Sequence, residues 1–338
     1  MVMKHGTNYY PPLLTKTARP EMTDRELIGF PESFTELREF IFTKEIQTAI
    51  ENKTSIYLAD LIENKDVSLD IRYFAGQALC YRDDPRIKTL NPSMCDVKGG
   101  IVSVGIDAEQ IDQVMVDCDH LKLDRIWIEK ETPEHQVHLD SYRIGKYPVT
   151  NKEYKDFLLD SREERIPRHW FLGRYPRECA NHPVMGISEE DAECYISWLN
   201  KKTGRKFRLP TEHEWEYAAS GPGKLQYPWG NHFLPDHCNT AEFGLLTTTP
   251  VGLFCHADSP IGCTDMAGNV EEFVADFYAP YPGADFIEDD LVNKLGAYRV
   301  ARGGSFSRFQ DLTRNTRRHG AFPSDIYVMG FRLAEDGK

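Results

Sequence analysis

The last third of the chain constrains the fold most, because it lacks any long regular element. After Gly221 the sequence consists of short apolar pieces set in polar loops, among them YPWGN, GCTDMAGNVEEF, RVARGGSF and MGFRL. Such pieces are too short for the long helices of a bundle or the long strands of an extended sheet. We therefore expect long loops that helices and strands alone do not fix in place. Bound ions are one common way to fix such loops.

Three helix starts precede this region. The segments TNKE at 150–153, SEED at 188–191 and TEHE at 211–214 have capping-box spacing, and an apolar stripe follows each of them. Gly204 and Gly221 stand where C-caps would end the second and third helices. The adjacent His and Glu of the third segment do not share a helix face, so we interpret them as part of a cap rather than as a metal pair.

Between the N-terminal region and these helices the pattern favours strands. The stretch KGGIVSVGID, which begins at Lys98, alternates apolar residues between glycines and predicts a strand. A loop is expected from there through Leu123, and two or three short strands are expected within 125–151. His138 alternates with apolar neighbours in this segment, which predicts a solvent-facing side chain rather than a metal ligand.

The N-terminal region has a different texture. Residues 1–35 are rich in Pro, Thr and Tyr without periodicity, and we expect an extended arm. Apolar residues at helical spacing then predict a short helix around 58–62 and a longer one over 71–79, which Pro85 terminates. The pair resembles one HEAT-like repeat. Because one such unit cannot bury its own face, the alternative is a helical lid packed on a larger domain.

Charge and hydropathy exclude several classes of function. The 338 residues include 40 Lys and Arg against 53 Asp and Glu, a net charge of −13. This balance argues against a nucleic-acid binder and against attachment to anionic membranes. No apolar stretch is long enough to span a bilayer, no signal peptide opens the sequence, and the eight cysteines contain no CxxC pair. We expect a cytoplasmic protein with free thiols.

The order and spacing of several motifs identify a resemblance. YPVTNKEY, HPVMGISEEDAECYISWLN, YPWGN, CTDMAGNVEEF, RVARGGSF and MGFRLA together resemble the formylglycine-generating-enzyme, or sulfatase-modifying-factor, family. This resemblance implies an α+β fold of the C-type-lectin-like type, with little regular secondary structure and a small helical segment before it. We accordingly expect an N-terminal arm and helical segment over 1–97 and a sulfatase-modifying-factor-like domain over 98–338.

The family includes copper enzymes, which hold their metal with two cysteines in the last loop. Between the GGS motif at 303–305 and the GFR motif at 330–332 this sequence has no cysteine. The two positions fall near Thr313 and Arg318. Threonine and arginine cannot replace a thiolate pair for cuprous ion, so neither copper nor formylglycine generation is expected.

Other family members look like ergothioneine-type sulfoxide synthases, whose iron sits on three histidines supplied largely by an N-terminal bundle. Residues 1–97 contain only His5, yet the C-terminal texture looks closer to those synthases than to the copper enzymes. The resemblance therefore implies a metal-dependent oxidoreductase of the non-heme iron type, acting on a small or peptide-linked substrate that could be anionic. The alternative is a non-catalytic ligand- or protein-binding module, with the N-terminal helices as an adaptor for a protein partner.

A structural calcium site is also implied by the resemblance. The family loop N/D-x-x-G-N-x-x-E is matched by DMAGNVEE, which assigns the side chains of Asp265 and Glu272 and the carbonyls of Gly268 and Val270 as ligands. Carboxylates and carbonyls suit a hard cation. The alternative is a polar turn without metal. A second family site at Asn239 lacks the later aspartate that it would need.

We expect the functional site in the arginine-rich segment 302–322, RGGSFSRFQDLTRNTRRHGAF. Its arginines could clamp a carboxylate or phosphate, and its histidine could transfer protons near neutral pH. The alternative is that some of these arginines pair with the excess carboxylates of the protein. The pocket candidates are Thr313, Arg317, Arg318 and His319, and the expected ligand-binding residues are Trp229, Phe306, Arg314 and Phe322.

Overall fold

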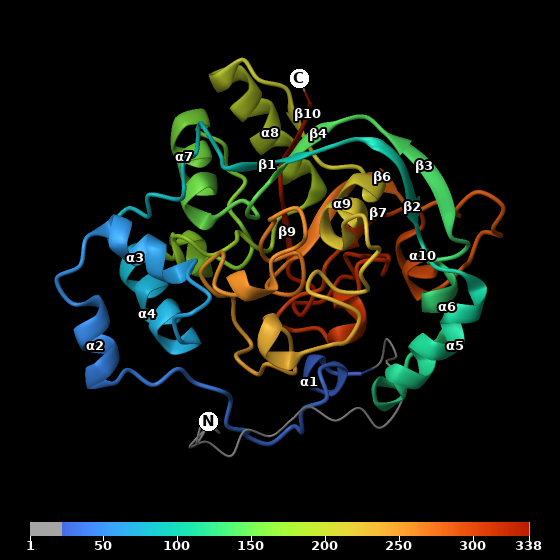
Figure 1. Cartoon of the computed structure of the whole chain (residues 1–338), viewed down its shortest axis with the longest axis horizontal. Coiled ribbons are helices and arrows are strands. Elements are labelled where there is room, and N and C mark those ends of the chain that lie inside the picture. Colours follow the sequence, from blue (N-terminus) through green and yellow to red (C-terminus); the bar gives the residue numbers. More distant parts are fainter. Residues whose placement is uncertain (1–21, 338) are drawn as a thin grey trace.

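The computed structural model describes residues 22–337, so most of the expected arm over 1–35 lies outside the described residues. The described helices are α1 (Asp24–Leu27), α2 (Lys44–Ile50), α3 (Ser55–Ile62), α4 (Leu69–Cys80), α5 (Ala108–Asp117), α6 (Arg125–Glu129), α7 (Asn151–Ser161), α8 (Glu189–Thr203), α9 (Glu212–Ser220) and α10 (Asp290–Leu295). In Figure 1, α2–α4 lie at one side of the molecule, α5 and α6 at the opposite side, and the loops of the C-terminal third fill the centre.

The strands form three small sheets. The first has the order β1 (Met94–Val97), β4 (Tyr142–Gly145), β10 (Ala334–Asp336), β5 (Phe207–Arg208); the second pairs β2 (Gly100–Val104) with β3 (His135–Leu139); the third has the order β8 (His319–Gly320), β7 (Arg299–Arg302), β6 (Glu271–Phe277), β9 (Met329–Phe331). All pairs are antiparallel except β6 with β9. Short strands and long loops agree with the expected α+β architecture.

The three expected capping boxes are present. Thr150, Ser188 and Thr211 each accept a hydrogen bond from the N3 backbone amide of α7, α8 and α9. Gly204 ends α8 in the left-handed conformation, as glycine at this position commonly does. One apolar cluster joins α7, α8 and β9, and a second packs α9 against β4, β6 and β7 around the fully buried Trp215.

Two elements correct the sequence-based prediction. The expected loop through Leu123 contains α5, which a capping box between Asp107 and Gln110 starts. Its buried Ile111 and Val114 are one turn apart and pack with Ile128 of α6. The start of the segment expected to form strands is therefore helical, and β3 and β4 follow it. The side chain of His138 is 69% exposed, as predicted.

The N-terminal helices pack on the larger part of the molecule, in the manner of a lid. The α4 side chain of Arg72 donates to the carbonyl of Leu253 at 2.8 Å. Asn181 donates to the carbonyl of Gly76 at 3.1 Å, and Gln77 contacts His182 at 2.9 Å. Apolar side chains add to this contact, because Leu69 and Tyr73 of α4 pack against the cluster that contains Leu253. Directly after them, β1 pairs with β4 and so belongs to the first sheet.

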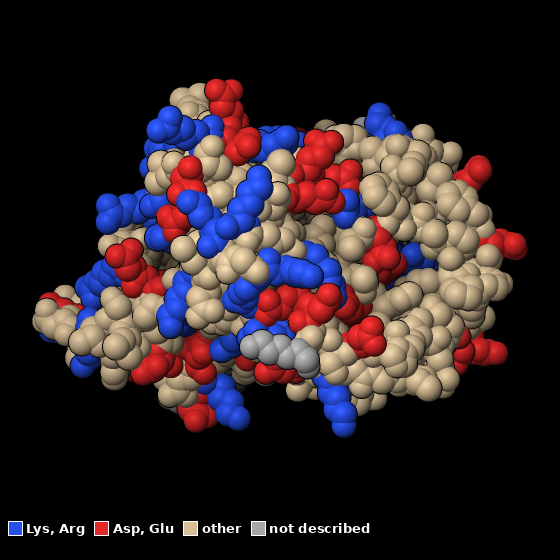
Figure 2. Space-filling model, turned by 90° about the horizontal axis from the view of Figure 1, so that it is seen from above, with Lys and Arg blue, Asp and Glu red and all other residues tan. Residues whose placement is uncertain are grey.

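The surface carries charges of both signs. Figure 2 shows basic and acidic side chains interspersed on the face seen from above. Ion pairs such as Arg143 with Glu335 at 2.6 Å and Arg208 with Asp336 at 2.9 Å join the strands of the first sheet. No helix within residues 22–337 has both the length and the apolar character that a membrane crossing requires.

Candidate functional site

The arginine-rich segment 302–322 is an internal loop rather than an exposed surface, because nearly all of its residues are buried. Arg318 donates Nε and Nη2 to the carboxylate of Glu212 at 2.7 and 2.9 Å. Arg302 donates Nη2 to Glu212 at 2.9 Å and to Glu216 at 3.0 Å. Burial alone would raise the pKa of Glu212, but the two guanidinium groups outweigh it and hold that pKa at about 2.

Arg314 is buried in the same way. Its Nη1 donates to Glu131 Oε2 at 2.8 Å, and its Nη2 pairs with the other oxygen of that carboxylate. Thr313 is fully buried and donates its hydroxyl to the carbonyl of Gln310 at 2.8 Å. These side chains hold the loop in place. The arginines could either bind a ligand or pair with carboxylates of the protein. Arg302, Arg314 and Arg318 pair with carboxylates of the protein.

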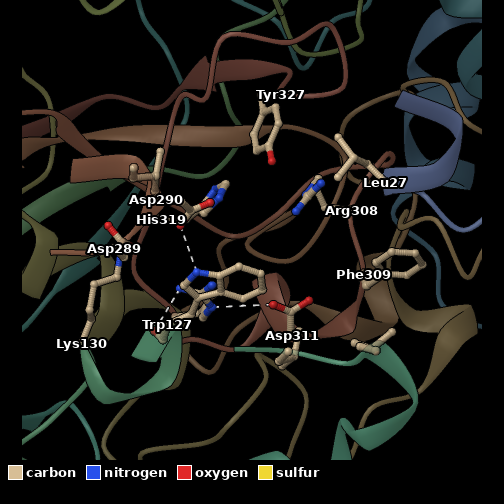
Figure 3. Close-up of a pocket in the computed structure, with 14 residues that line it drawn as sticks. Leu27, Trp127, Lys130, Asp289, Asp290, Arg308, Phe309, Asp311, His319 and Tyr327 are labelled. Carbon is tan, nitrogen blue, oxygen red and sulfur yellow. Dashed lines mark hydrogen bonds and ion pairs between the residues drawn. The ribbon is translucent and has the colours of Figure 1, made fainter. Parts of the chain in front are cut away.

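A cavity of about 40 Å³ lies beside this loop, and Figure 3 shows the side chains around it. A volume of this size accommodates about three water molecules, or the carboxylate end of a larger molecule. Segments far apart in the sequence contribute: α1, the region around α6, α10 with the residue before it, and the stretch 308–327. The lining residues are Leu27, Leu121, Leu123, Trp127, Lys130, Asp289, Asp290, Leu291, Arg308, Phe309, Asp311, Arg317, His319 and Tyr327.

Arg308 is the cation of the cavity that lacks a carboxylate partner within the described residues. Its Nε and Nη1 are buried and form no hydrogen bond with any residue between 22 and 337. Its guanidinium carbon lies 4.7 Å from the ring centroid of Tyr327, a cation–π contact. Buried guanidinium N–H groups without acceptors are costly, so an acceptor placed in the cavity would be favoured.

The other two cations of the cavity have partners. Lys130 forms an ion pair with Asp289 and donates to Tyr298 at 3.0 Å. Burial and the neighbouring charge of Arg317 lower the pKa of Lys130 to about 8. Arg317 in turn lies 3.6 Å from Asp311, measured from Nε to Oδ2. Lys130 and Arg317 thus form ion pairs, whereas Arg308 forms none within residues 22–337 and interacts with Glu271, Asp311 and Asp290 only at longer range.

A histidine–carboxylate pair completes the site. His319 Nδ1 lies 2.7 Å from Glu271 Oε2, and the ring of His319 stacks on Tyr327 with centroids 5.4 Å apart. Glu271 is fully buried, and its Oε1 has no hydrogen-bond partner in the described part of the chain. The pairing of β6 with β7 and of β7 with β8 sets the two side chains together.

Several predicted site residues lie elsewhere. Of the pocket candidates, Arg317 and His319 line the cavity. Trp229 stacks on Tyr227 with centroids 5.4 Å apart, Phe306 is buried, and Phe322 packs against the second apolar cluster. Sequence reasoning missed Arg308, Trp127 and Tyr327, because nothing in the sequence separates the one unpaired arginine from its paired neighbours.

The residues assigned to calcium make other contacts. Both carboxylate oxygens of Glu272 accept hydrogen bonds from Arg332, at 2.6 and 2.7 Å, and Trp215 adds a third at 2.8 Å. Asp265 Oδ2 accepts from the backbone amide of Gly252 at 2.7 Å. Glu272 therefore does not fit as a calcium ligand in this arrangement.

The other two groups assigned to calcium are the backbone carbonyls of Gly268 and Val270. They lie in a loop that is fixed by contacts within the chain. The amide of Gly268 donates to the carbonyl of Gly303 at 2.7 Å, and Val270 is buried directly before β6. Within residues 22–337, no group of three or more His, Cys, Asp or Glu side chains is placed to hold a metal. The cavity itself offers one imidazole, His319, so its donors do not fit a histidine-rich iron centre.

Comparison with known proteins identifies the family. Residues 82–337 match the sulfatase-modifying factor enzyme 1-like domain. The chain belongs to the sulfatase-modifying factor family. Among solved structures, PvdO of Pseudomonas aeruginosa is 25% identical and superimposes with a TM-score of 0.55, over 74% of this chain and 97% of PvdO. Variable protein 1 of Treponema denticola, 19% identical with a TM-score of 0.52, shares the fold over 72% of this chain and 95% of its own.

Curated relatives have varied names. The serine/threonine-protein kinase Pkn1 of Chlamydia trachomatis is 35% identical over 230 residues, which are 62% of this chain and 35% of the kinase. Hercynine oxygenase of Mycobacterium tuberculosis is 31% identical over 244 residues, 62% of this chain and 56% of the oxygenase. The chain thus spans between a third and somewhat over half of the length of these relatives. The predicted family and fold class are confirmed.

Proposed function

We propose that this protein binds the anionic group of a small molecule or peptide in the cavity beside Arg308. The observation that carries the proposal is the guanidinium of Arg308, whose buried Nε and Nη1 lack acceptors among the residues that the structure describes. A carboxylate is the simplest partner, because it accepts two hydrogen bonds and neutralises the charge. The aromatic rings of Trp127 and Tyr327 flank the same space, as in many small-molecule sites.

The experiment compares Arg308→Gln with the wild-type chain. Binding of acetate, pyruvate and inorganic phosphate is measured by isothermal titration calorimetry and by saturation-transfer NMR. We expect at least one of these anions to bind the wild type and R308Q to lose about tenfold or more in affinity, which corresponds to one charge-assisted hydrogen bond. The matched control is Arg168→Gln, whose side chain is 54% exposed. Equal affinity in R308Q and the wild type would contradict the proposal.

A second candidate is a non-heme iron oxidoreductase, favoured by the 31% identity to hercynine oxygenase over 244 residues. The donors around the cavity do not supply a histidine-rich iron site, so this function requires ligands beyond those that residues 22–337 bring together. Elemental analysis of the purified full-length chain tests it. Stoichiometric iron would support the oxidoreductase, and substoichiometric metal together with anion binding would support the binding function.

A further inference from the structure

Glu271 and His319 have the arrangement of an acid–base pair that faces the cavity. The carboxylate of Glu271 is fully buried and lies 2.7 Å from Nδ1 of His319. We assign the ring proton to Nδ1, because an ionised carboxylate can only accept. Nε2 of the neutral ring is then an acceptor with a free lone pair, and no hydrogen bond to it occurs within the described residues.

The imidazole is held in one orientation. Tyr327 stacks on it at an interplanar angle of 22°, and β8 fixes its backbone beside β7. His319 also lines the cavity, together with Arg308, and Figure 3 shows both side chains projecting into the same space. A group bound to Arg308 would therefore lie within reach of a positioned base.

The ion pairs and the unbonded N–H groups of the site indicate which kind of ligand would bind beside His319. Lys130 and Arg317 are paired with Asp289 and Asp311, whereas Arg308 forms no ion pair within the described residues and is influenced by Glu271, Asp311 and Asp290 only at longer range. A guanidinium whose Nε and Nη1 lack acceptors within residues 22–337, beside a space of about 40 Å³, suits one carboxylate and the atoms next to it. In a ligand bound in this way, the hydrogen nearest to His319 would be attached to an atom close to the ligand's own carboxylate.

We propose that His319 is a catalytic base which, oriented by Glu271, removes and returns a proton on a small carboxylate held by Arg308. This inference rests on the proposed binding function. In the step, His319 Nε2 takes the proton, the C–H or O–H bond breaks, and the electron pair stays on the ligand. Glu271 stabilises the imidazolium without being protonated itself. The proton then returns, so the reaction needs no oxidant, reductant or metal.

Pyruvate is the probe, because it is a small carboxylate with an acidic methyl group. Exchange of its methyl hydrogens for deuterium is followed by NMR in D₂O, alongside its binding. The wild type is expected to exchange about 10²-fold or more above buffer, the usual contribution of a positioned base. His319→Asn keeps a donor towards Glu271 but removes Nε2, so it should bind pyruvate and lose exchange. Glu271→Gln should bind equally and exchange about tenfold more slowly.

The outcomes separate this inference from the binding function. Pyruvate that binds the wild type in an Arg308-dependent manner without exchange overturns the acid–base role and leaves the binding function intact. Failure of pyruvate, acetate and phosphate to bind overturns both. A second measurement does not depend on the substrate: ¹⁵N NMR should show that the neutral form of the His319 ring carries its proton on Nδ1 and not on Nε2, and the opposite tautomer would overturn the inference.

Discussion

Arg318 and Glu212 form a two-point ion pair inside the molecule, with donor–acceptor distances of 2.7 and 2.9 Å. Their side chains are 2% and 4% exposed. Arg302 donates to the same carboxylate from β7 at 2.9 Å. One carboxylate in the first turn of α9 thus accepts hydrogen bonds from two cations of the loop 302–322, of which Arg302 also pairs with Glu216, so a shift of the helix or the loop would break buried ion pairs.

Removing the charge of Glu212 should therefore lower the free energy of unfolding. Glu212→Gln keeps the shape of the side chain but leaves Arg302 and Arg318 buried without full compensation. We expect the free energy of unfolding to fall by about 3–5 kcal/mol, as when one partner of a buried ion pair is removed. Urea denaturation measures this change. The control is Glu164→Gln, an exposed loop position, for which a change within about 0.5 kcal/mol is expected. Equal stability of both variants would contradict the argument.

The same carboxylate should make the protein acid-sensitive in a defined range. Burial would raise the pKa of Glu212, but Arg302 and Arg318 lower it to about 2, from an ordinary value of 4.5. Because the folded pKa lies below the unfolded one, this stabilisation is present above about pH 4.5 and is lost as the pH falls towards 2. Urea denaturation at several acidic pH values should show a weaker pH dependence for Glu212→Gln than for the wild type.

His182 should respond to acid at higher pH. It is buried, contacts Gln77 of α4 at 2.9 Å and Thr248 at 3.0 Å, and burial lowers its pKa to about 3 from 6.5. The unfolded chain takes up this proton first, so stability is lost as the pH falls from about 6.5 towards 3. Hydrogen exchange should show α4 losing protection before the rest of the fold. The loss of α4 protection on acidification should be unchanged in the control His138→Gln, whose side chain is exposed, and smaller in His182→Gln.

Local signals made much of the fold predictable. The capping boxes at Thr150, Ser188 and Thr211 lie within four residues and depend on nothing distant, so α7, α8 and α9 were predicted correctly. The capping box of α5 was equally local, at Asp107 and Gln110, but was overlooked in a segment interpreted as loop. α6 has only five residues, which is too short for a periodic pattern.

The site was less predictable because its contacts are long-range. Arg314 meets Glu131, which is 183 positions away in the sequence, and His319 meets Glu271 across the sheet. Sequence alone identifies a surplus of carboxylates and a run of arginines, but it does not say which of them pair. Arg308 therefore looked like its neighbours, and the loop expected to be a working surface proved to be mostly internal.

The calcium assignment can be tested against the ion pair that the structure contains. Glu272 accepts two hydrogen bonds from Arg332, both residues being almost fully buried. Glu272→Gln should lower the free energy of unfolding by about 3–5 kcal/mol, and to the same extent with added calcium or with a chelator. Thermal denaturation under the two conditions measures this. A wild-type chain that calcium stabilises, and a variant that it does not, would instead support Glu272 as a ligand.

Access to the cavity should depend on the segment that contains α1. Leu27 lines the cavity, and the segment is held to the loop before β9 by a hydrogen bond from Ser324 to Asp24 at 2.6 Å. Ile28 packs against Ile326 in the same contact. Leu27→Ala should enlarge the cavity and speed anion association, while Leu27→Trp should fill it and weaken binding about tenfold or more.

Stopped-flow association and calorimetry, with the anion that binds the wild type, measure these effects. Because Leu27 is only partly buried, neither substitution should lower the free energy of unfolding by more than about 1–2 kcal/mol, so a loss of binding would not reflect unfolding. Unchanged affinity in Leu27→Trp would mean that the anion enters and sits away from this segment, and would move the binding site from the cavity to another part of the surface.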